Sequence, residues 1–336
     1  MKKIVILLVV ITVLFILNGV GVFAQEQVWE FKLGSKMIET HPESQGVLKF
    51  IKLVDERSKG RIKIIPYFGE ILGPSKVQLE NVITGTQDFY TASYTFLANY
   101  VPEFRVHSLP YLFESYEEYQ KFLLSPIEEN MEKKIIKNVG LRVLNEKKNW
   151  KIGAYRVIVS KKPIKSIDDI KGLKLRQPDN QTTIKIWTAL GANVVIIPFT
   201  ETYLALQQGM VDALTTTLEG YSSVKFFDIA KHITKSNEYQ QQDCTVMNER
   251  KFQSLPQDLQ EVIIESMNDA GDFTTQLIEN KAIEIENELK NKHGVQIHDI
   301  DLKPFKEKTQ AAYDELEASG FIPAGILDQI KDYLAE

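Results

Sequence analysis

Residues 163–212 constrain the fold of this chain more than any other segment, because they predict a strand, a helix, a second strand and a second helix in succession. The first strand ends at Arg176, since Pro178 forces the residue before it into an extended conformation and closes the segment. Apolar residues at helical spacing follow and stop at Gly191, and the second helix stops at Gly209. Strands that alternate with helices predict an α/β protein with a parallel sheet.

A weaker echo of this pattern lies upstream. Residues 64–67 (IIPY) parallel 196–199 (IIPF), and after a helical stretch 85–89 (GTQDF) parallel 209–213 (GMVDA). The intervening lengths differ, which argues against a solenoid repeat. The echo predicts two α/β lobes of similar build that face each other across a cleft. Chance similarity between short α/β signals is the alternative.

Two side chains fall where strands of the first segment should end, and they are candidates for a binding site. Ligands of open α/β sheets bind outside the carboxyl ends of the strands, which is where Arg176 and Phe199 lie in the sequence. A guanidinium in that place can bind a carboxylate through two parallel hydrogen bonds. The alternatives are a surface or interlobe salt bridge for Arg176 and a place in the core for Phe199.

The N-terminus has the pattern of a secretory signal peptide. Two lysines precede an apolar run over residues 4–17, and Val22-Phe23-Ala24 offers a small-residue cleavage site before Gln25. A membrane-spanning helix needs about 20 apolar residues, and this run is shorter. The alternative is that the segment stays uncleaved as a membrane anchor. Without residues 1–24, the chain suits one large or two medium domains.

Charge and cysteine content exclude some functions. The net charge of −5 at pH 7 argues against a nucleic-acid partner, for which a basic patch would be expected. Cys244 is the only cysteine, so no intramolecular disulfide can form, and a buried thiol is its expected role. Together with the signal peptide, these features predict a soluble exported protein in the periplasm or elsewhere outside the cytoplasm.

The predicted architecture is an α/β fold of two lobes. It has three parts: a signal peptide over 1–24, an N-terminal α/β lobe over 25–150 completed by about 241–270, and a second α/β lobe over 151–240 completed by parts of 271–336. The hinge is expected at the extended segments 151–160 and 241–248, because a lobe inserted in another is entered and left by neighbouring strands. A helical pattern over 256–294 is longer than one lobe needs and should brace both.

Motifs of catalysis and metal binding are missing from the sequence. No His-Glu-x-x-His, Cys-x-x-Cys, Gly-x-Ser-x-Gly or P-loop pattern occurs. Residues 19–24 (GVGVFA) match a dinucleotide fingerprint by letter, but they lie in the predicted signal peptide, without the strand and helix that the motif needs. The five histidines show no metal-ligand spacing. The expectation is a binding protein with no catalytic residues, no metal and no cofactor.

Short motifs follow one another in a specific order along the chain. Between Gly153 and Pro256 they are GAYR, KPIKSIDDIKGLKLRQP, ALGANVVIIPFTETYLALQQGMVDA, KFFDIAKHIT and NERKFQSLPQDLQ. In the N-terminal lobe they are His41-Pro42, Lys59-Gly60-Arg61-Ile62, Leu72-Gly73, Thr84-Gly85 and Leu109-Pro110-Tyr111-Leu112-Phe113. In this order they resemble the solute-binding proteins of tripartite ATP-independent periplasmic (TRAP) transporters, over nearly all of the chain after the signal peptide.

The resemblance implies a Venus-flytrap protein, whose two lobes capture a small organic acid for delivery to membrane permease subunits. In the family, the arginine of the GLKLR-type motif, here Arg176, grips the ligand carboxylate. Arg156 stands where sialic-acid-binding members carry a second arginine that contacts the ligand, and a structural ion pair at the hinge is the alternative. Phe199 takes the place of an aromatic or apolar residue that lines the pocket.

One departure from the family pattern concerns the ligand. The family commonly reads Asp-Gly-Gln-Glu-Asn-Pro where this chain has DALTTT over residues 212–217, so Thr216 replaces an asparagine that bonds the ligand. That puts a C4-dicarboxylate or sialic acid ligand in doubt, though not the binding role. The other ligand-binding candidates lie in loops over the expected cleft or near the hinge: Glu70, Ser93, Tyr94, His41 and Tyr239.

Three functions fit these observations. The leading prediction is the extracytoplasmic solute-binding protein of a TRAP transporter, which binds a mono- or dicarboxylate through an arginine–carboxylate contact. The alternatives are an exported enzyme that acts on a carboxylate substrate and a sensory ligand-binding module. The long helix could also pair with a copy of itself in a homodimer.

We predict that the mature chain starts near Gln25, because a basic start, a short apolar run and a small-residue site precede it. Intact-mass analysis of the exported protein measures this. A dominant species that retains residues 1–24 would reject cleavage and favour the uncleaved anchor.

Overall fold

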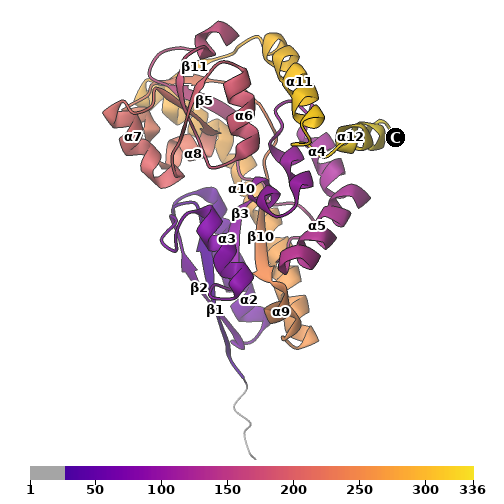
Figure 1. Ribbon diagram of the computed structural model, residues 1–336. Coiled ribbons are helices and arrows are strands. Elements are labelled where there is room, and N and C mark those ends of the chain that lie inside the picture. The colour runs from indigo at the N-terminus through magenta and orange to yellow at the C-terminus, as the bar shows by residue number, and fades with distance from the viewer. Residues whose placement is uncertain (1–26) are drawn as a thin grey trace, which may run out of the picture.

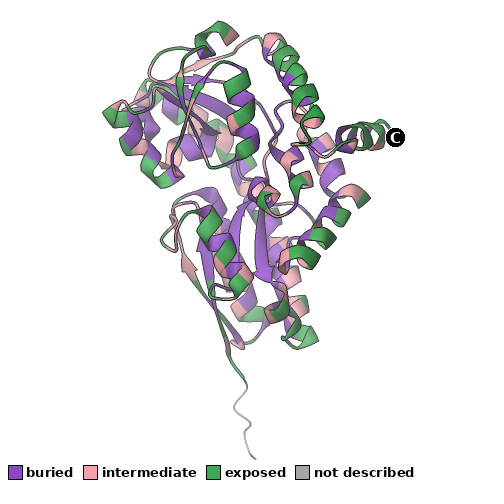
Figure 2. Ribbon diagram, viewed as in Figure 1, coloured by how far each residue is buried: buried purple, intermediate pink, exposed green. Residues whose placement is uncertain are grey.

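The computed structural model describes residues 27–336 and shows a two-lobed α/β molecule (Figure 1). The predicted signal peptide and its cleavage site lie outside the described residues. Each lobe contains one mixed β-sheet, whose strands are largely buried while the outward faces of the surrounding helices are exposed (Figure 2). Over residues 27–336, no helix is long and apolar enough to cross a membrane.

The sheet of the first lobe has the strand order β2-β1-β3-β10-β4. The strands are β1 (Trp29–Ser35), β2 (Ile62–Tyr67), β3 (Phe89–Ser93), β4 (Leu141–Val143) and β10 (Asp243–Asn248). The helices are α2 (Pro42–Arg57), α3 (Ser75–Thr84), α4 (Tyr116–Leu123), α5 (Pro126–Val139) and α9 (Glu249–Gln253), with the 3₁₀ helices η1 (Tyr94–Asn99) and η2 (Pro102–Ser108).

The sheet of the second lobe has the strand order β11-β9-β5-β8-β6-β7. The strands are β5 (Arg156–Ser160), β6 (Lys174–Gln177), β7 (Asn193–Ile196), β8 (Ala213–Thr217), β9 (His232–Thr234) and β11 (Gln296–His298). The helices are α6 (Gln181–Ala189), α7 (Thr202–Gln208) and α8 (Leu218–Ser223), with the 3₁₀ helices η3 (Ile167–Ile170), η4 (Phe199–Glu201) and η5 (Phe226–Asp228).

The two sheets share one topology. β1 lies between β2 and β3, and β6 lies between β7 and β8, with parallel pairing throughout. An antiparallel strand then follows in each sheet, β10 beside β3 and β5 beside β8. The helices that precede β3 and β8 both end at a left-handed glycine, Gly85 with a φ of 81° and Gly209 with a φ of 75°. These are the glycines of the sequence echo, which therefore marks a repeated topology.

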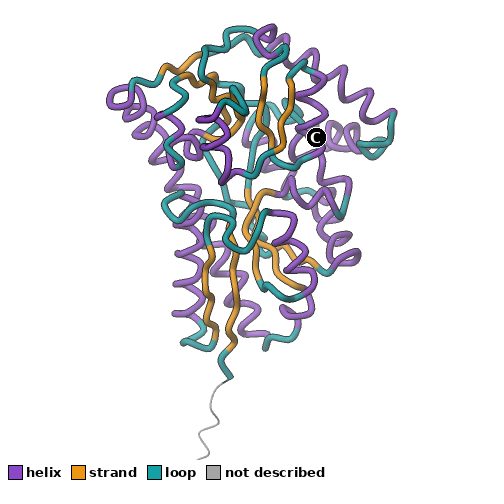
Figure 3. The backbone as a smooth tube through the Cα atoms, turned by 60° about the vertical axis from the view of Figure 1, so that its left-hand side comes forward, coloured by secondary structure: helices purple, strands orange, loops and turns teal. Residues whose placement is uncertain are grey.

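The parallel strands lead into loops in the region between the two sheets (Figure 3). β3, β5, β8 and β10 are buried along their whole length, as expected for strands that are covered on both faces. The carboxyl ends of β1 and β6, which are the central strands of the two repeats, bring their following loops to the cleft. This arrangement brings residues from opposite lobes together.

Two of the places where the chain passes between the lobes lie side by side. Lys151 and Gln242 form an isolated antiparallel bridge, and the Asp243 N–H donates to the carbonyl oxygen of Trp150 over 3.0 Å. Lys151, Gln242 and Asp243 lie in the segments 151–160 and 241–248 where the sequence predicts the hinge, and Trp150 immediately precedes the first of these segments. We propose the boundary between the lobes at these two crossings.

The helix α10 (Gln257–His293) is 37 residues long and packs against both lobes. Its N-terminal half contacts α2 of the first lobe, and it also contacts α8 of the second. The two helices that follow repeat this bridging, because α11 (Lys303–Ala318) packs on α6 and α12 (Ile326–Ala335) packs on α4. The C-terminal quarter of the chain therefore ties the lobes together.

Gly271 in α10 allows a close contact with the segment that leads to the hinge. A Cβ atom at this position would lie 2.1 Å from the Oδ1 atom of Asn149. The Asn149 amide is held in place, because Asn145 Nδ2 donates to its Oδ1 over 2.7 Å and its own Nδ2 donates to Asp272 Oδ1 over 2.6 Å. Any larger residue than glycine would displace this amide.

We predict that Gly271→Ala destabilises the protein. Alanine favours an exposed helix over glycine by about 1 kcal/mol. Here the added methyl group should break hydrogen bonds of Asn149, for a net loss of about 1–2 kcal/mol in the free energy of unfolding, measured by denaturant titration. In an Asn149→Ala background the same change should be neutral or stabilising. An equal loss in both backgrounds would contradict this explanation.

Candidate functional site

Two cavities lie in the cleft between the lobes, and they share the lining residues Lys36, Phe96, Arg176, Pro178 and Phe199. The inner chamber has a volume of about 30 Å³, and its other lining residues are Met37, Thr95, Ile152, Arg156, Thr215, Thr216, Thr217, Tyr239 and Gln241. The outer cavity has a volume of about 310 Å³, and its other lining residues are Glu70, Pro74, Ser75, Lys76, Val77, Asp179, Ile196 and Pro198.

Arg176 lies at the junction of the two cavities and is buried, with 2% of its surface exposed. Its Nε donates to the carbonyl oxygen of Ile197 over 2.8 Å, whereas its Nη2 has no hydrogen-bond partner among residues 27–336. Burial lowers the pKa of Arg176 to about 10, so the guanidinium is still charged at neutral pH. A buried charged donor without a partner is unfavourable unless a ligand pairs with it.

Lys36 faces the same junction from the first lobe, in the loop after β1. Its Nζ lies 5.4 Å from the ring centre of Phe96 and 5.3 Å from that of Phe199. Burial, and then the nearby charge of Arg176, lower the pKa of Lys36 to about 8. The nearest acidic groups are Glu70, Asp243 and Glu43, and burial raises the pKa of the last two, which weakens their compensation.

Arg156, in contrast, has its partners within the protein. Its Nε donates to Glu238 Oε1 over 2.8 Å, its Nη1 to Gln241 Oε1 over 2.6 Å and its Nη2 to Thr215 Oγ1 over 3.0 Å. The ring of Tyr239 lies 4.3 Å from the guanidinium carbon. These contacts support the ion-pair alternative for Arg156, although its side chain still lines the inner chamber.

The structure brings four more of the predicted site residues to the cleft. Phe199 and Tyr239 are buried, and Phe199 lies 5.6 Å from the Arg176 guanidinium carbon. Thr216 lines the inner chamber from β8. Glu70 lines the outer cavity, and the Thr200 hydroxyl of the opposite lobe donates to its Oε2 over 3.0 Å. The last contact joins the two lobes across the mouth of the cleft.

Three predicted site residues line neither cavity. His41 is the N-cap of α2, and its Nδ1 accepts from the Glu43 N–H over 3.1 Å. Ser93 caps η1, and Tyr94 is buried in a stack with His107, with ring centres 5.0 Å apart. The strand β3 does end near the cleft, but at the start of the following 3₁₀ helix the side chains of Ser93 and Tyr94 are buried in the core. We therefore withdraw these three residues as direct ligand contacts.

Lys36 and Phe96 are the main residues that sequence reasoning missed. Lys36 directly follows β1, which corresponds in the repeat to β6, the strand of Arg176, so the sequence echo was a signal that could have found it. Phe96 follows Ser93 by one turn, in a segment that alternation alone presents as a strand running into a loop. Its orientation depends on η1, which the sequence pattern does not indicate.

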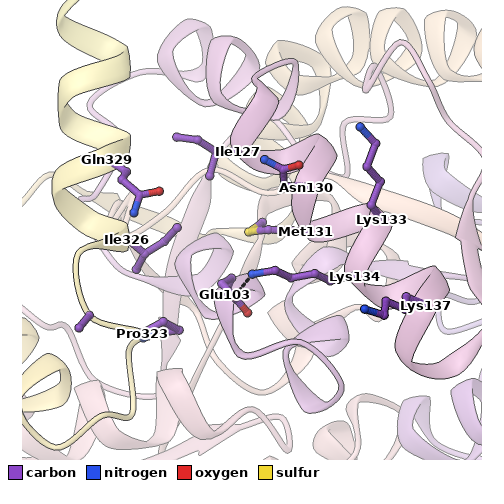
Figure 4. A pocket seen from close by; sticks show the side chains of 11 residues that line it. Glu103, Ile127, Asn130, Met131, Lys133, Lys134, Lys137, Pro323, Ile326 and Gln329 are labelled. Atoms are coloured by element: carbon purple, nitrogen blue, oxygen red, sulfur yellow. Dashed lines mark hydrogen bonds and ion pairs between the residues drawn. The ribbon is translucent and has the colours of Figure 1, made fainter.

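A third cavity of about 420 Å³ lies between α5 and α12 and shares no lining residue with the two cavities of the cleft (Figure 4). Lys133, Lys134 and Lys137 line it from α5, and Lys134 pairs with Glu103. These lysines are exposed, so water already solvates their charges, and the cavity lacks the desolvated groups of the cleft. Among residues 27–336, no group of three or more His, Cys, Asp or Glu residues could hold a metal ion.

The fold and the cleft define a two-lobed periplasmic binding protein of the Venus-flytrap type. The model of the family "Bacterial extracellular solute-binding protein, family 7" matches residues 33–319. The chain therefore belongs to this family, the solute-binding proteins of TRAP transporters.

Individual relatives agree with this assignment. The chain is 26% identical over 266 residues to the sialic acid-binding periplasmic protein SiaP of Vibrio cholerae, covering 79% of this chain and 81% of the relative. A TRAP solute-binding protein of Fusobacterium nucleatum with bound sn-glycerol-3-phosphate is 26% identical, with a TM-score of 0.86 over 92% of this chain and 97% of the other. One of Ochrobactrum anthropi with bound L-fuconate is 29% identical, with a TM-score of 0.84 over 91% and 99%. These structures confirm the predicted fold.

We predict that the charge of Lys36 destabilises the unliganded protein. Its pKa is lowered from 10.5 to about 8, so the unfolded chain binds the proton more tightly between these pH values, and stability should rise with pH across that window. Lys36→Met removes the buried charge. The variant should gain about 1–2 kcal/mol in the free energy of unfolding at pH 7, after a discount for partial exposure, and the gain should shrink towards pH 10.

Denaturant titration without ligand at both pH values measures this gain. Lys76→Met at the exposed rim is the matched control, and it should change the stability little at either pH. If the two variants changed the free energy of unfolding equally, the charge of Lys36 would not destabilise the protein as predicted.

Proposed function

We propose that this protein is the extracytoplasmic solute-binding protein of a TRAP transporter, and that it captures a small organic acid between Arg176 and Lys36. The observation that carries the proposal is the pair of cations from opposite lobes at one junction, neither of which has an ion-pair partner among residues 27–336. The unpaired Nη2 of Arg176 supplies the donor for the carboxylate. Membrane permease subunits then receive the acid.

An anion between these groups changes the electrostatics of the cleft. Without it, two positive charges from opposite lobes repel each other, and this repulsion adds to burial in lowering the pKa of Lys36. A carboxylate satisfies both and favours the closed arrangement of the lobes. A hydrogen bond to a charged group contributes about 1.5–3 kcal/mol net, so two such bonds and an apolar lining are compatible with micromolar affinity, about −8 kcal/mol.

The relatives support an acidic ligand. Sialic acid and L-fuconate each carry a carboxylate, and glycerol-3-phosphate carries a phosphate. The common requirement is a cationic anchor in the cleft, which Arg176 and Lys36 supply here. Because the family consists of periplasmic transport proteins, we place this chain outside the cytoplasm and assign it no catalysis.

Two experiments separate this proposal from the alternatives. Mass spectrometry of the purified protein should detect an unaltered acid, whereas an enzyme would convert it. Genes for two membrane permease subunits beside this one would favour transport over a sensory role.

We predict that Arg176→Lys is not a conservative change. Lysine keeps the charge but loses the planar fork, which leaves one carboxylate oxygen under-satisfied in the cleft. The expected loss is about 1–3 kcal/mol, roughly 5- to 150-fold in affinity, and Arg176→Ala should lose more. Calorimetric titration with the acid identified by mass spectrometry measures this.

Thermal melts of the unliganded variants control for folding, because Arg176 faces the cleft and its loss should leave the fold intact. Lys281→Met removes an exposed positive charge on α10 that lines neither cavity, and this control variant should bind as the wild type does. Unchanged affinity in Arg176→Ala would reject Arg176 as the anchor.

A further inference from the structure

The inner chamber has room for a carboxylate and little else. Its volume of about 30 Å³ is only two to three times the about 10–15 Å³ that a cavity needs to hold one water molecule. Most of its polar groups are already paired, through the bonds Arg156 Nη2 to Thr215 Oγ1 (3.0 Å), Arg156 Nη1 to Gln241 Oε1 (2.6 Å) and Gly220 N to Thr217 Oγ1 (3.1 Å). The Nη2 of Arg176 and the hydroxyls of Thr95, Thr216 and Tyr239 are left for a ligand. The body of any larger acid must therefore extend into the outer cavity.

The outer cavity is ten times larger and mainly apolar. Its volume of about 310 Å³ is in the range of small-molecule sites. More than half of its lining residues are apolar, namely Pro74, Val77, Phe96, Pro178, Ile196, Pro198 and Phe199. Two of them are unusually exposed for their type, Val77 at 41% and Ile196 at 52%, so a ligand in this cavity would cover apolar surface that water now contacts.

Neutral hydrogen-bonding groups are scarce in the outer cavity. The hydroxyl of Ser75 accepts from the Tyr90 hydroxyl over 2.8 Å, and Glu70 Oε2 accepts from Thr200 over 3.0 Å. Lys76 and Asp179 are exposed, charged side chains at the rim. A chain of hydroxyl groups in this space would give up hydrogen bonds to water and would find few partners besides the charged side chains of Lys36, Glu70, Lys76 and Asp179, which opposes binding.

We propose that the ligand is a carboxylic acid with an apolar body, an aryl or branched-alkyl group that occupies the outer cavity while the carboxylate occupies the inner chamber. This inference rests on the proposed function and adds the chemical class of the acid. It separates the chain from the relatives whose ligands are hydroxyl-rich acids, such as L-fuconate. The ligand is selected by the difference between the polar inner chamber and the mainly apolar outer cavity.

Calorimetric titration of the unliganded protein, refolded from denaturant to remove any retained ligand, tests the proposal. The probes are phenylacetate and 4-methylpentanoate on one side and gluconate on the other. The apolar acids should bind at least about tenfold more tightly than gluconate, with a negative heat-capacity change from apolar burial. Equal or tighter binding of gluconate overturns the proposal, and binding of none of the acids overturns both it and the proposed function.

A pair of matched substitutions locates the apolar body. Ile196→Asn places an amide in the outer cavity, and the preference for phenylacetate over gluconate should fall by about fivefold or more. Ile283→Asn makes the same change on α10, at a side chain that is 73% exposed and lines neither cavity, and should leave the preference unchanged. Equal effects of the two substitutions would overturn the placement of the apolar body.

The variant Arg176→Ala tests the arginine anchor separately from the chemical class of the ligand. If it abolishes binding of every acid while the apolar acids are preferred in the wild type, both proposals stand. If it abolishes binding but gluconate is preferred, only the inference about the ligand class fails. If it leaves the apolar preference and the affinities intact, the arginine anchor fails and the ligand class stands.

Discussion

The cleft is organised around two positive charges, Arg176 and Lys36, that meet there without a carboxylate in ion-pair contact among residues 27–336. Glu238 neutralises Arg156, which leaves Arg176 and Lys36 as the two cations at the junction of the cavities that have no ion-pair partner among residues 27–336. Each comes from a different lobe, and both are covered by the ring of Phe199. In the function that we propose, an anion at this point completes the interlobe contact, so that ligand recognition and lobe closure depend on the same electrostatic interaction.

The repeated topology explains why these two groups meet. Each lobe has a central parallel strand, β1 or β6, flanked by the two strands that follow it in the repeat. The carboxyl end of such a strand is where open α/β sheets bind ligands, because the connections on its two sides leave in opposite directions. Two such ends facing each other create a site that neither lobe contains alone. The antiparallel strands β5 and β10 then connect the repeats near the hinge.

The sequence predicted the class of fold, the repeat and the strand end at Arg176, because all three depend on local periodicity and on the stop signal of Pro178. It did not predict Lys36, since nothing adjacent to that residue distinguishes it from a solvated lysine until Phe199 is placed opposite. Ser93 and Tyr94 were misassigned because alternation cannot show a 3₁₀ turn at a strand end. Arg156 needed its partner Glu238, 82 residues later, before its ion pair could be recognised.

The path of the chain limits which part of this molecule could be exchanged as one unit with a related protein. The first lobe receives β10 after most of the second lobe, the second lobe receives β11 later still, and α10, α11 and α12 pack against both lobes in turn. No single cut therefore releases one lobe with its complete sheet. The two lobes are separate in space, but their segments alternate along the sequence. Ligand specificity must therefore be exchanged between relatives through residues in the cleft and not through exchange of whole lobes.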